Sequence, residues 1–509
     1  MKVLPFLQSS RSKSEKYVIQ FRGLNYGEGY ADGELRDCQN LSTEKYPAMS
    51  PRRQRRKERE FVTPSTLHGK DGLLVVDGTT VLYNGNPVGN VTEGRKQIAS
   101  VGNYVVIFPD KVYYNAADNS FQNMEASYSA SGLVFAADNK ESTITAAEGD
   151  IWPFREGDAV EISGCSIAEN NKTPIVRGVE GNVLKFDGNI LTEGTEPGEV
   201  TVKRNVPELE YICESNGRLW GVSGSTILAS KYMDPLNFFA YDGGAEASYH
   251  VEVPSDGPFT GCIPYSGHIC FFKENVLHKL YGSKPSNYQL LTSHVHGVQA
   301  GSERSLCLVN EQLLYKGVNG VYAYTGGVPE LISGHFGSMQ FSEAAAACDG
   351  ERYYISMKRG AQWHLFVYDI GKGIWLREDD THAIDMAYHN GQIYFLCEDA
   401  LWRVDRDGSK DVEWSATFCP FNETMDERKG YSRFNMRVEL AAGAWLSVAV
   451  KTDQDSQWRE VYTTHNERAR TISVPIVPTR CDEVSVRVYG KGDVTIRAFV
   501  REFAVGSDV

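Results

Sequence analysis

A dense basic run lies between residues 51 and 60 of a chain that is otherwise acidic. Its six cations are Arg52, Arg53, Arg55, Arg56, Lys57 and Arg59. Arginine forks bind phosphate oxygens in pairs, and neutralised phosphates release counterions, so phosphate contact here would weaken with salt. The run also suits a solvated arm that docks on an acidic face of a neighbouring subunit, and a localisation signal is a third interpretation. We favour the docking arm and treat the six side chains as candidate interface or phosphate contacts.

Two histidines could bind a metal ion. His294 and His296 are spaced to lie on one face of a strand. A zinc site needs three or four ligands, and no third ligand is identifiable near this pair in the sequence. A turn or subunit-contact role fits the two histidines better, and we predict neither a metal site nor a bound cofactor.

Neighbouring carboxylates offer the best chance of enzyme chemistry. They occur at Asp379 and Asp380 and again at Asp405 and Asp407. Aspartates are also ordinary residues of the turns that connect strands. The sequence contains no nucleophile elbow, phosphate-binding loop, zinc-protease motif or dinucleotide fingerprint in its proper context. It therefore predicts no catalytic residues and a protein that is not an enzyme.

Tyrosines in loop-like stretches could read carbohydrate. Tyr46, Tyr265, Tyr288 and Tyr431 lie among Pro, Ser or Gly residues, where a saccharide-binding protein would place rings. Tyrosines in loops are also common anchors of protein interfaces, so subunit contact is an equally good interpretation.

The ten cysteines are scattered singly, without a Cys-x-x-Cys pair. Most lie beside apolar residues, as small buried hydrophobic residues do. We expect reduced thiols in a cytoplasmically folded protein, with no disulfide framework and no zinc site.

The elements that must position these residues are strands. From about residue 72 to 408 a short apolar strand, a turn with Gly, Asn or Asp and a second strand recur. Asp77-Gly78, between two apolar segments, is a strong hairpin signal. The units return every ~40 to 50 residues, which is the period of propeller blades. The sequence therefore predicts an all-β protein with a β-propeller of roughly six to eight blades.

Three other regions lack this repeat of strand, turn and strand. Residues 123–206 read as short strands with tight turns, which predicts a small inserted β-barrel or sandwich. Residues 412–509 contain strands of period two, which predicts a C-terminal β-sandwich. Residues 1–71 are expected to form an N-terminal arm and strap, which leaves 72–122 for the first blades and 207–411 for the remaining ones. The nearest approach to a helix is residues 341–348.

Composition limits the possible partners. The 509 residues are 41% hydrophobic and 23% charged, which is ordinary for a folded chain. A formal net charge of −14 should repel nucleic acid and anionic membranes, so any contact with a polyanion must be local. The apolar run in residues 1–7 is shorter than the core of a signal peptide, and no later run reaches the ~18 residues of a membrane span.

Several stretches resemble tailed-phage virion proteins of the packaged-DNA stabilisation or nozzle type. The first contains residues 21–25 (Phe-Arg-Gly-Leu-Asn), 33–42 and 46–52 (Tyr-Pro-Ala-Met-Ser-Pro-Arg). The second contains residues 234–238 (Asp-Pro-Leu-Asn-Phe), 253–261, 271–274 and 281–288, and the third is residues 320–329. These motifs are structural turns, and no catalytic residue is implied by them.

The resemblance implies a structural tail subunit located in the virion and assembled in the host bacterial cytoplasm. It would form a homo-oligomeric ring, with a hexamer as the expected form, around the DNA exit channel at the head–tail connection. Its partners would be portal, adaptor and other tail proteins, with transient contact to phage DNA during genome ejection. An acidic chain suits such a channel because DNA must slide through it. The alternatives are a receptor- or glycan-binding propeller of the tail and, third, a propeller glycosidase or lyase.

Overall fold

The computed structural model describes residues 13–424, 427–468, 470–477 and 480–505. They divide into a first unit (residues 1–60, 319–323 and 330–509) and a second unit (residues 61–318 and 324–329). Strands joined by turns build both units, and the helices of the described residues are four short 3-10 turns: η1 (Ala168–Asn170), η2 (Pro285–Asn287), η3 (Glu303–Ser305) and η4 (Gly334–Phe336). The predicted all-β class is confirmed. No described helix has the length and apolarity to cross a membrane.

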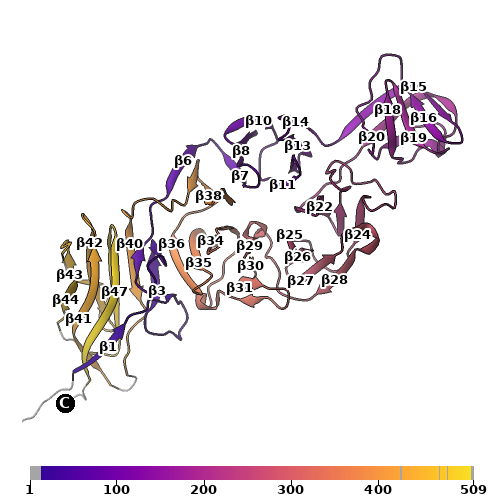
Figure 1. The fold of residues 1–509 in the computed structure, drawn as a ribbon. Helices are drawn as coiled ribbons and strands as arrows, with labels where there is room; N and C mark the ends of the chain where they lie inside the picture. Colours follow the sequence, from indigo (N-terminus) through magenta and orange to yellow (C-terminus); the bar gives the residue numbers. More distant parts are fainter. Residues whose placement is uncertain (1–12, 425–426, 469, 478–479, 506–509) are drawn as a thin grey trace, which may run out of the picture. The chain divides into compact units, whose positions relative to one another are not determined.

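Four-stranded antiparallel sheets make up most of the second unit (Figure 1). The first two contain β7 (Pro64–His68), β8 (Leu74–Asp77), β9 (Thr80–Tyr83) and β10 (Asn86–Asn90), and β11 (Gln97–Val101), β12 (Tyr104–Phe108), β13 (Val112–Asn115) and β14 (Ser120–Asn123). The next two contain β21 (Ile212–Ser215), β22 (Arg218–Ser223), β23 (Thr226–Ala229) and β24 (Tyr249–Glu252), and β25 (Gly261–Tyr265), β26 (His268–Lys273), β27 (Val276–Tyr281) and β28 (Gln289–Ser293). Each is an up-and-down meander, the unit of a propeller blade. The predicted hairpin joins β8 to β9, with Gly78 at a φ of 57°.

Three further sheets of this kind follow in the chain. Their strands are β29 (Cys307–Val309), β30 (Gln312–Gly317), β31 (Gly320–Tyr324) and β32 (Glu330–Leu331); β33 (Ala344–Cys348), β34 (Arg352–Arg359), β35 (Gln362–Asp369) and β36 (Ile374–Asp379); and β37 (Asp385–His389), β38 (Gln392–Cys397) and β39 (Ala400–Arg403) with β6 (Arg56–Glu60). The described residues thus contain seven four-stranded sheets, within the predicted range of six to eight. The segment closest to a helix in the sequence is instead strand β33, because its alanines are buried against β34.

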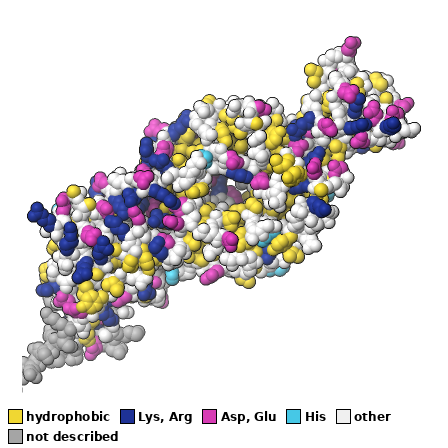
Figure 2. Space-filling view, viewed as in Figure 1, with side chains coloured by type: hydrophobic (Ala, Val, Ile, Leu, Met, Phe, Trp, Pro, Cys, Tyr) yellow, Lys and Arg dark blue, Asp and Glu magenta, His cyan; other side chains and the backbone are white. Residues whose placement is uncertain are grey.

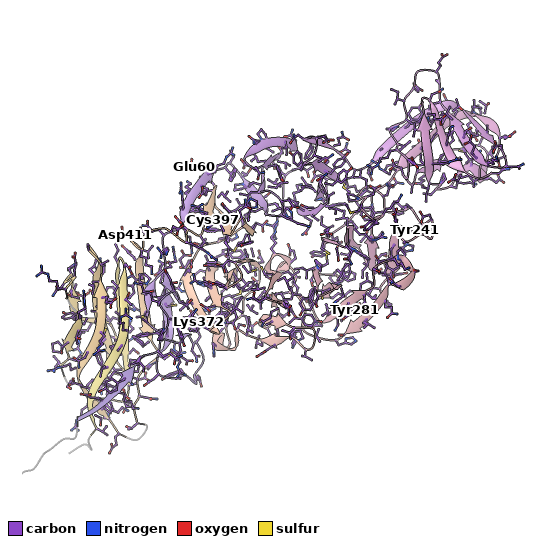
Figure 3. All side chains as sticks on the ribbon, in the orientation of Figure 1. Glu60, Tyr241, Tyr281, Lys372, Cys397 and Asp411 are labelled. Atoms are coloured by element: carbon purple, nitrogen blue, oxygen red, sulfur yellow. The ribbon has the colours of Figure 1, made fainter. Side chains whose placement is uncertain are left out.

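The last of these sheets is completed from a distant part of the sequence. β6 pairs antiparallel with β39, so that Glu60 lies opposite Ala400 and Arg56 opposite Arg403. Figure 3 labels Glu60 and Cys397 at the same end of this sheet. The second half of the basic run therefore supplies the edge strand of a sheet.

The insert forms one six-stranded sheet in the order β17-β20-β15-β16-β19-β18 (Figure 1). Its strands are β15 (Ala126–Ala137), β16 (Glu141–Thr145), β17 (Glu161–Ser163), β18 (Val176–Glu180), β19 (Val183–Asp187) and β20 (Gly194–Arg204). Val160 N–H donates to Pro174 O at 3.0 Å and Ile162 N–H to Lys172 O at 2.8 Å, which joins the two edges. The insert is therefore a small closed barrel around an apolar core that includes Phe135, Trp152 and Phe186.

A buried polar joint anchors the barrel within the second unit. The Arg204 guanidinium donates to an Asp158 carboxylate oxygen at 2.7 Å, and Asn237 donates to the other oxygen at 3.0 Å. Asn237 also accepts from the Ala159 N–H at 3.0 Å. Asn237 belongs to the Asp-Pro-Leu-Asn-Phe motif of residues 234–238, and its amide here has a structural role.

Two sheets of the first unit form the sandwich. One has the order β1-β47-β41-β44 with β45 on β41, and the other β2-β3-β40-β46-β42-β43. Their strands are β1 (Lys13–Val18), β2 (Gly23–Leu24), β3 (Glu34–Gln39), β40 (Glu413–Phe418), β41 (Lys429–Leu440), β42 (Trp445–Thr452), β43 (Arg459–Thr464), β44 (Thr471–Pro475), β45 (Arg480–Cys481), β46 (Val484–Lys491) and β47 (Val494–Val505). Phe418 of one sheet stacks on Phe499 of the other, with ring centroids 5.2 Å apart.

The expected N-terminal arm differs from what the structure shows. β1, β2 and β3 belong to the two sandwich sheets, and only residues 1–12 of the predicted arm lie outside the described residues. Pairing with β47 and β40 satisfies backbone groups that a free arm would leave to water. The N-terminal segment is thus part of the folded body of the first unit.

Candidate functional site

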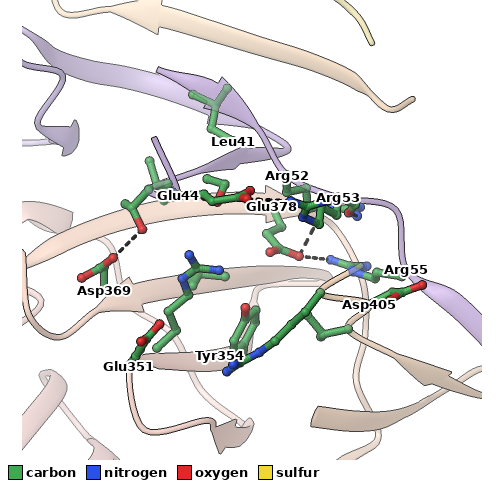
Figure 4. A pocket seen from close by; sticks show the side chains of 17 residues that line it. Leu41, Glu44, Arg52, Arg53, Arg55, Glu351, Tyr354, Asp369, Glu378 and Asp405 are labelled. Atoms are coloured by element: carbon green, nitrogen blue, oxygen red, sulfur yellow. Dashed lines mark hydrogen bonds and ion pairs between the residues drawn. The ribbon is translucent and has the colours of Figure 1, made fainter. Parts of the chain in front are cut away.

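Arginines from the first half of the basic run line a pocket in the first unit (Figure 4). Its cavity volume is about 180 Å³. The lining residues are Leu41, Ser42, Thr43, Glu44, Arg52, Arg53, Arg55, Glu351, Arg352, Tyr354, Val367, Asp369, Leu376, Glu378, Val404, Asp405 and Arg406. Five arginines and five carboxylates are among them, so the pocket is charged but balanced.

Backbone hydrogen bonds place the N-terminal segment beside β36. Strands β4 (Leu41–Ser42) and β5 (Ser50–Pro51) form a short antiparallel pair. Asn40 N–H donates to Glu378 O at 2.8 Å, and Arg52 N–H donates to Asn40 O at 2.8 Å. Asn40 has a φ of 55°, a conformation that Asn tolerates better than most residues, and it turns the chain into this pair. The arginines that follow β5 therefore face the carboxylates of β36.

Four of these side chains form a closed ionic network. Arg55 donates to Glu378 at 2.5 Å and lies 2.9 Å from an Asp379 oxygen, and its Nη1 also donates to Thr381 at 2.8 Å. Arg52 lies 3.5 Å from Glu378 and 3.3 Å from Asp379. Figure 4 shows Arg52 and Arg55 converging on Glu378. Two positive charges thus meet two negative ones at the pocket wall.

Two other carboxylates of the pocket, Glu44 and Asp369, also have cationic partners. Glu44 pairs with Arg53 at 2.7 Å and with Lys410 at 2.9 Å. Asp369 pairs with Lys372 at 2.8 Å and accepts a hydrogen bond from Thr43. Arg forks that already hold carboxylates have few donors left for phosphate, so phosphate contact is disfavoured for Arg52, Arg53 and Arg55.

The network also sets the protonation of its members. Burial raises the pKa of Asp379, but the charges of Arg55 and Arg52 and the hydrogen bonds from Thr381 outweigh it and hold that pKa below 3.8. Burial also raises the pKa of Glu44, but the hydrogen bonds from Lys410 and Arg53 outweigh it. The pKa of Glu44 is therefore lower than that of an ordinary glutamate. A general acid near neutral pH needs a raised pKa. Asp379 and Glu44 are instead held ionised, as ion-pair partners.

The second half of the basic run lies elsewhere in the same unit. Arg56, Lys57 and Arg59 are in β6, whose five residues are all exposed. Lys57 pairs with Glu60 at 2.7 Å, while Glu58 reaches Arg403 on the neighbouring strand at 3.1 Å. The basic run is therefore split between a structural network and an exposed edge strand.

The other sequence candidates do not come together. His294 and His296 are exposed, and the described residues contain no group of three or more His, Cys, Asp or Glu side chains able to hold a metal ion. Asp380 contacts His364 and Arg377, each at 2.8 Å. Asp405 accepts from the Asp407 N–H at 3.0 Å, which is turn chemistry.

The tyrosines that could bind carbohydrate differ in how far they are buried. Tyr265 and Tyr431 are buried core residues, so the interpretation of these two as exposed saccharide readers was wrong. Tyr288 packs edge-on against Trp220 with ring centroids 5.3 Å apart and is partly buried. The available signal near Tyr431 was the alternation of Phe434, Met436 and Val438, which marks the buried face of a strand.

Sequence reasoning missed the carboxylates that complete the network. Glu378 is buried near the end of β36, Asp369 ends the neighbouring strand β35, and Glu44 comes from a distant segment. An available signal was the run of charges from residue 377 to 380 inside an otherwise apolar strand, because a buried charge requires a partner.

Comparisons with known proteins identify no family for this chain. No model of a known protein family matches the sequence, and no curated protein matches it. Solved structures with similarity include phage phi92 endosialidase, 10% identical over 72% of this chain and 68% of that one, with a TM-score of 0.27. Dihydro-heme d1 dehydrogenase NirN is 10% identical over 83% and 76%, with a TM-score of 0.30. The exo-beta-1,3-galactanase from Phanerochaete chrysosporium is 8% identical over 57% and 95%, with a TM-score of 0.23.

Proposed function

We propose that the chain is a structural subunit of a bacteriophage tail, of the nozzle or packaged-DNA stabilisation type. It acts by assembling into a homo-oligomeric ring around the DNA exit channel, next to portal or adaptor proteins, and it performs no turnover. The sequence support is the set of turn motifs that resemble such proteins, including residues 46–52 and 234–238.

The observation that carries this proposal is the division of the basic run. Arg52, Arg53 and Arg55 are neutralised by carboxylates within the same unit, so they stabilise the fold. The cations of β6 are displayed on an exposed edge strand, where they can meet an acidic surface of another subunit. Figure 2 shows basic and acidic side chains interspersed on the face it presents, which suits specific docking better than coating by a polyanion.

Negative-stain microscopy of the purified chain, alone and with portal and adaptor proteins, tests this proposal. We expect closed rings, and we expect Arg56→Glu, Lys57→Glu and Arg59→Glu together to reduce their yield. A matched control carries Arg437→Glu, Arg459→Glu and Arg468→Glu, three exposed cations of the sandwich. Monomers under every condition, or equal ring loss in both variants, would contradict the proposal.

Glycan binding is a second candidate because two tyrosines are exposed on one loop of the second unit. Tyr232 and Tyr241 lie between β23 and β24, and the Tyr241 ring (labelled in Figure 3) packs edge-on against His250 at 5.0 Å. Exposed aromatic rings can stack on sugars. Saccharide binding on a glycan array that is lost in Tyr241→Ala would favour this function over ring assembly.

A further inference from the structure

Two cysteines lie on neighbouring strands of different sheets in the second unit. Cys213 is in β21 and Cys262 is in β25, the first strands of two consecutive four-stranded sheets. These two strands contact each other along the boundary between the sheets. Cys262 is the neighbouring group that most raises the pKa of the Cys213 thiol, and its side chain packs against the apolar cluster that contains Cys213. Two thiols far apart in the sequence thus lie at the same apolar cluster, on contacting strands.

Apolar side chains surround Cys213 and Cys262, and Cys262 remains partly accessible to solvent. Cys213 belongs to an apolar cluster with Trp220, Val253 and Phe271, and Cys262 packs against that cluster. Cys213 is buried with 8% of its surface exposed, whereas Cys262 is only partly buried. An oxidant from solvent can therefore reach Cys262 first.

We propose that Cys213 and Cys262 are a latent disulfide, which forms when the folded protein meets a peroxide and links two adjacent sheets. Neither Cys213 nor Cys262 is disulfide-bonded in the structure, so the bond is an addition to the reduced fold. A disulfide requires Cα atoms about 4.4 to 6.8 Å apart, a separation that adjacent contacting strands can provide.

The chemistry proceeds in two steps. The Cys262 thiolate attacks hydrogen peroxide, an S–O bond forms, the O–O bond breaks, and the departing hydroxide takes up a proton to become water. The Cys213 sulfur then attacks the Cys262 sulfenic sulfur, an S–S bond forms, and the hydroxyl group leaves as water with the Cys213 proton. In sum, two thiols and one peroxide give one disulfide and two waters.

The order of the steps follows from the environment of Cys213. The neighbouring Cys262 thiol, followed by burial, raises the pKa of Cys213 well above the usual value for a thiol. Cys213 is therefore a poor first nucleophile in solution and is suited to resolving an oxidised neighbour.

The consequence is a protein that is more stable after oxidation. A cross-link between residues 213 and 262 restricts the unfolded chain and so favours the folded state. If the proposed function holds, the chain folds in a reducing cytoplasm and acquires the bond after release of the virion. The bond itself does not depend on ring assembly, so the two ideas can fail separately.

The experiment treats the reduced, purified full chain with hydrogen peroxide at pH 8. We expect a mass loss of about 2 Da, from loss of two hydrogens, and a non-reduced peptide that joins Cys213 to Cys262. The thermal midpoint of the second unit should rise by several degrees and return with dithiothreitol. Cys262→Ser should abolish both effects, and Cys348→Ser, which removes another partly buried thiol, should leave both unchanged.

Two results would overturn the inference. One is a Cys262 sulfinic acid beside a free Cys213 thiol in the folded wild-type chain. The other is a cross-link between other cysteines in preference to this pair. Circular dichroism of the reduced Cys262→Ser and Cys262→Ala variants shows whether each is folded, and at least one folded variant keeps the comparison valid.

Discussion

Replacing Arg55 by methionine isolates the energy of the buried network. The Arg55 side chain is 9% exposed and Glu378 7%, so the substitution leaves a carboxylate in a poorly hydrated place. Removing one partner of a buried ion pair costs about 3 to 5 kcal/mol. Arg52 still lies 3.5 Å from Glu378 and 3.3 Å from Asp379, which should keep the cost near about 3 kcal/mol.

Arg56→Met is the matched control because it removes the same charge from the next residue. Arg56 is 63% exposed, and substitutions at such surfaces change stability by less than about 0.5 kcal/mol. The assay is hydrogen exchange by mass spectrometry on peptides from β36 and β6, with chemical unfolding of the full chain. We expect faster exchange in β36 for Arg55→Met alone.

A double substitution tests the physical reason. Arg55→Met with Glu378→Leu removes both charges and replaces them by apolar groups of similar size, which is often nearly neutral. The double variant should therefore recover much of the stability lost by Arg55→Met. Equal effects of Arg55→Met and Arg56→Met, or a double variant less stable than the single one, would refute the assignment of Arg55 to a buried network.

Two other predictions concern the same unit. Arg501 is fully buried in the sandwich, bonds Glu423 at 2.6 Å and Asp32 at 2.8 Å, and lies 3.9 Å from the centre of the Phe421 ring. Arg501→Met should lower the free energy of unfolding by about 3 to 5 kcal/mol, measured by hydrogen exchange in β47, and adding Glu423→Leu should restore part of that stability. Unchanged exchange in β47 of Arg501→Met would contradict this prediction. The pKa values of Asp379 and Asp369 are lowered in the fold, despite burial, by their cationic and hydrogen-bonding partners. Their stabilising contribution is therefore complete above the unfolded pKa of about 3.9 and is lost as pH falls through the folded values. The free energy of unfolding of the first unit, measured against pH, should be constant between about pH 7 and 5 and should fall below about pH 4. The fall should be smaller in Arg55→Met. An equal fall in that variant would contradict the assignment of the acid sensitivity to these ion pairs.

Local patterns were enough to predict the sheet units. Asp77-Gly78 forms its turn because Gly accepts a positive φ without a steric cost, and the strands on both sides are dictated by their own residues. The alternation in residues 484–488 predicts a strand with one buried face, as observed in β46. The alanines of β33 made this segment look closest to a helix, because Ala has a high intrinsic helix propensity. In the structure these small side chains are buried in a strand that pairs with β34.

The sequence by itself determined the all-β class, the repeated strand–turn–strand units and the position of the basic run, since each depends on residues close together in the chain. Only the tertiary structure decided that Arg55 is buried against Glu378 while Arg56 is exposed, and that Cys213 meets Cys262. Only it showed β1 pairing with β47, across almost the whole chain. Such pairings depend on which distant partner satisfies a charge, a thiol or a strand edge, and no local pattern of residues encodes that choice.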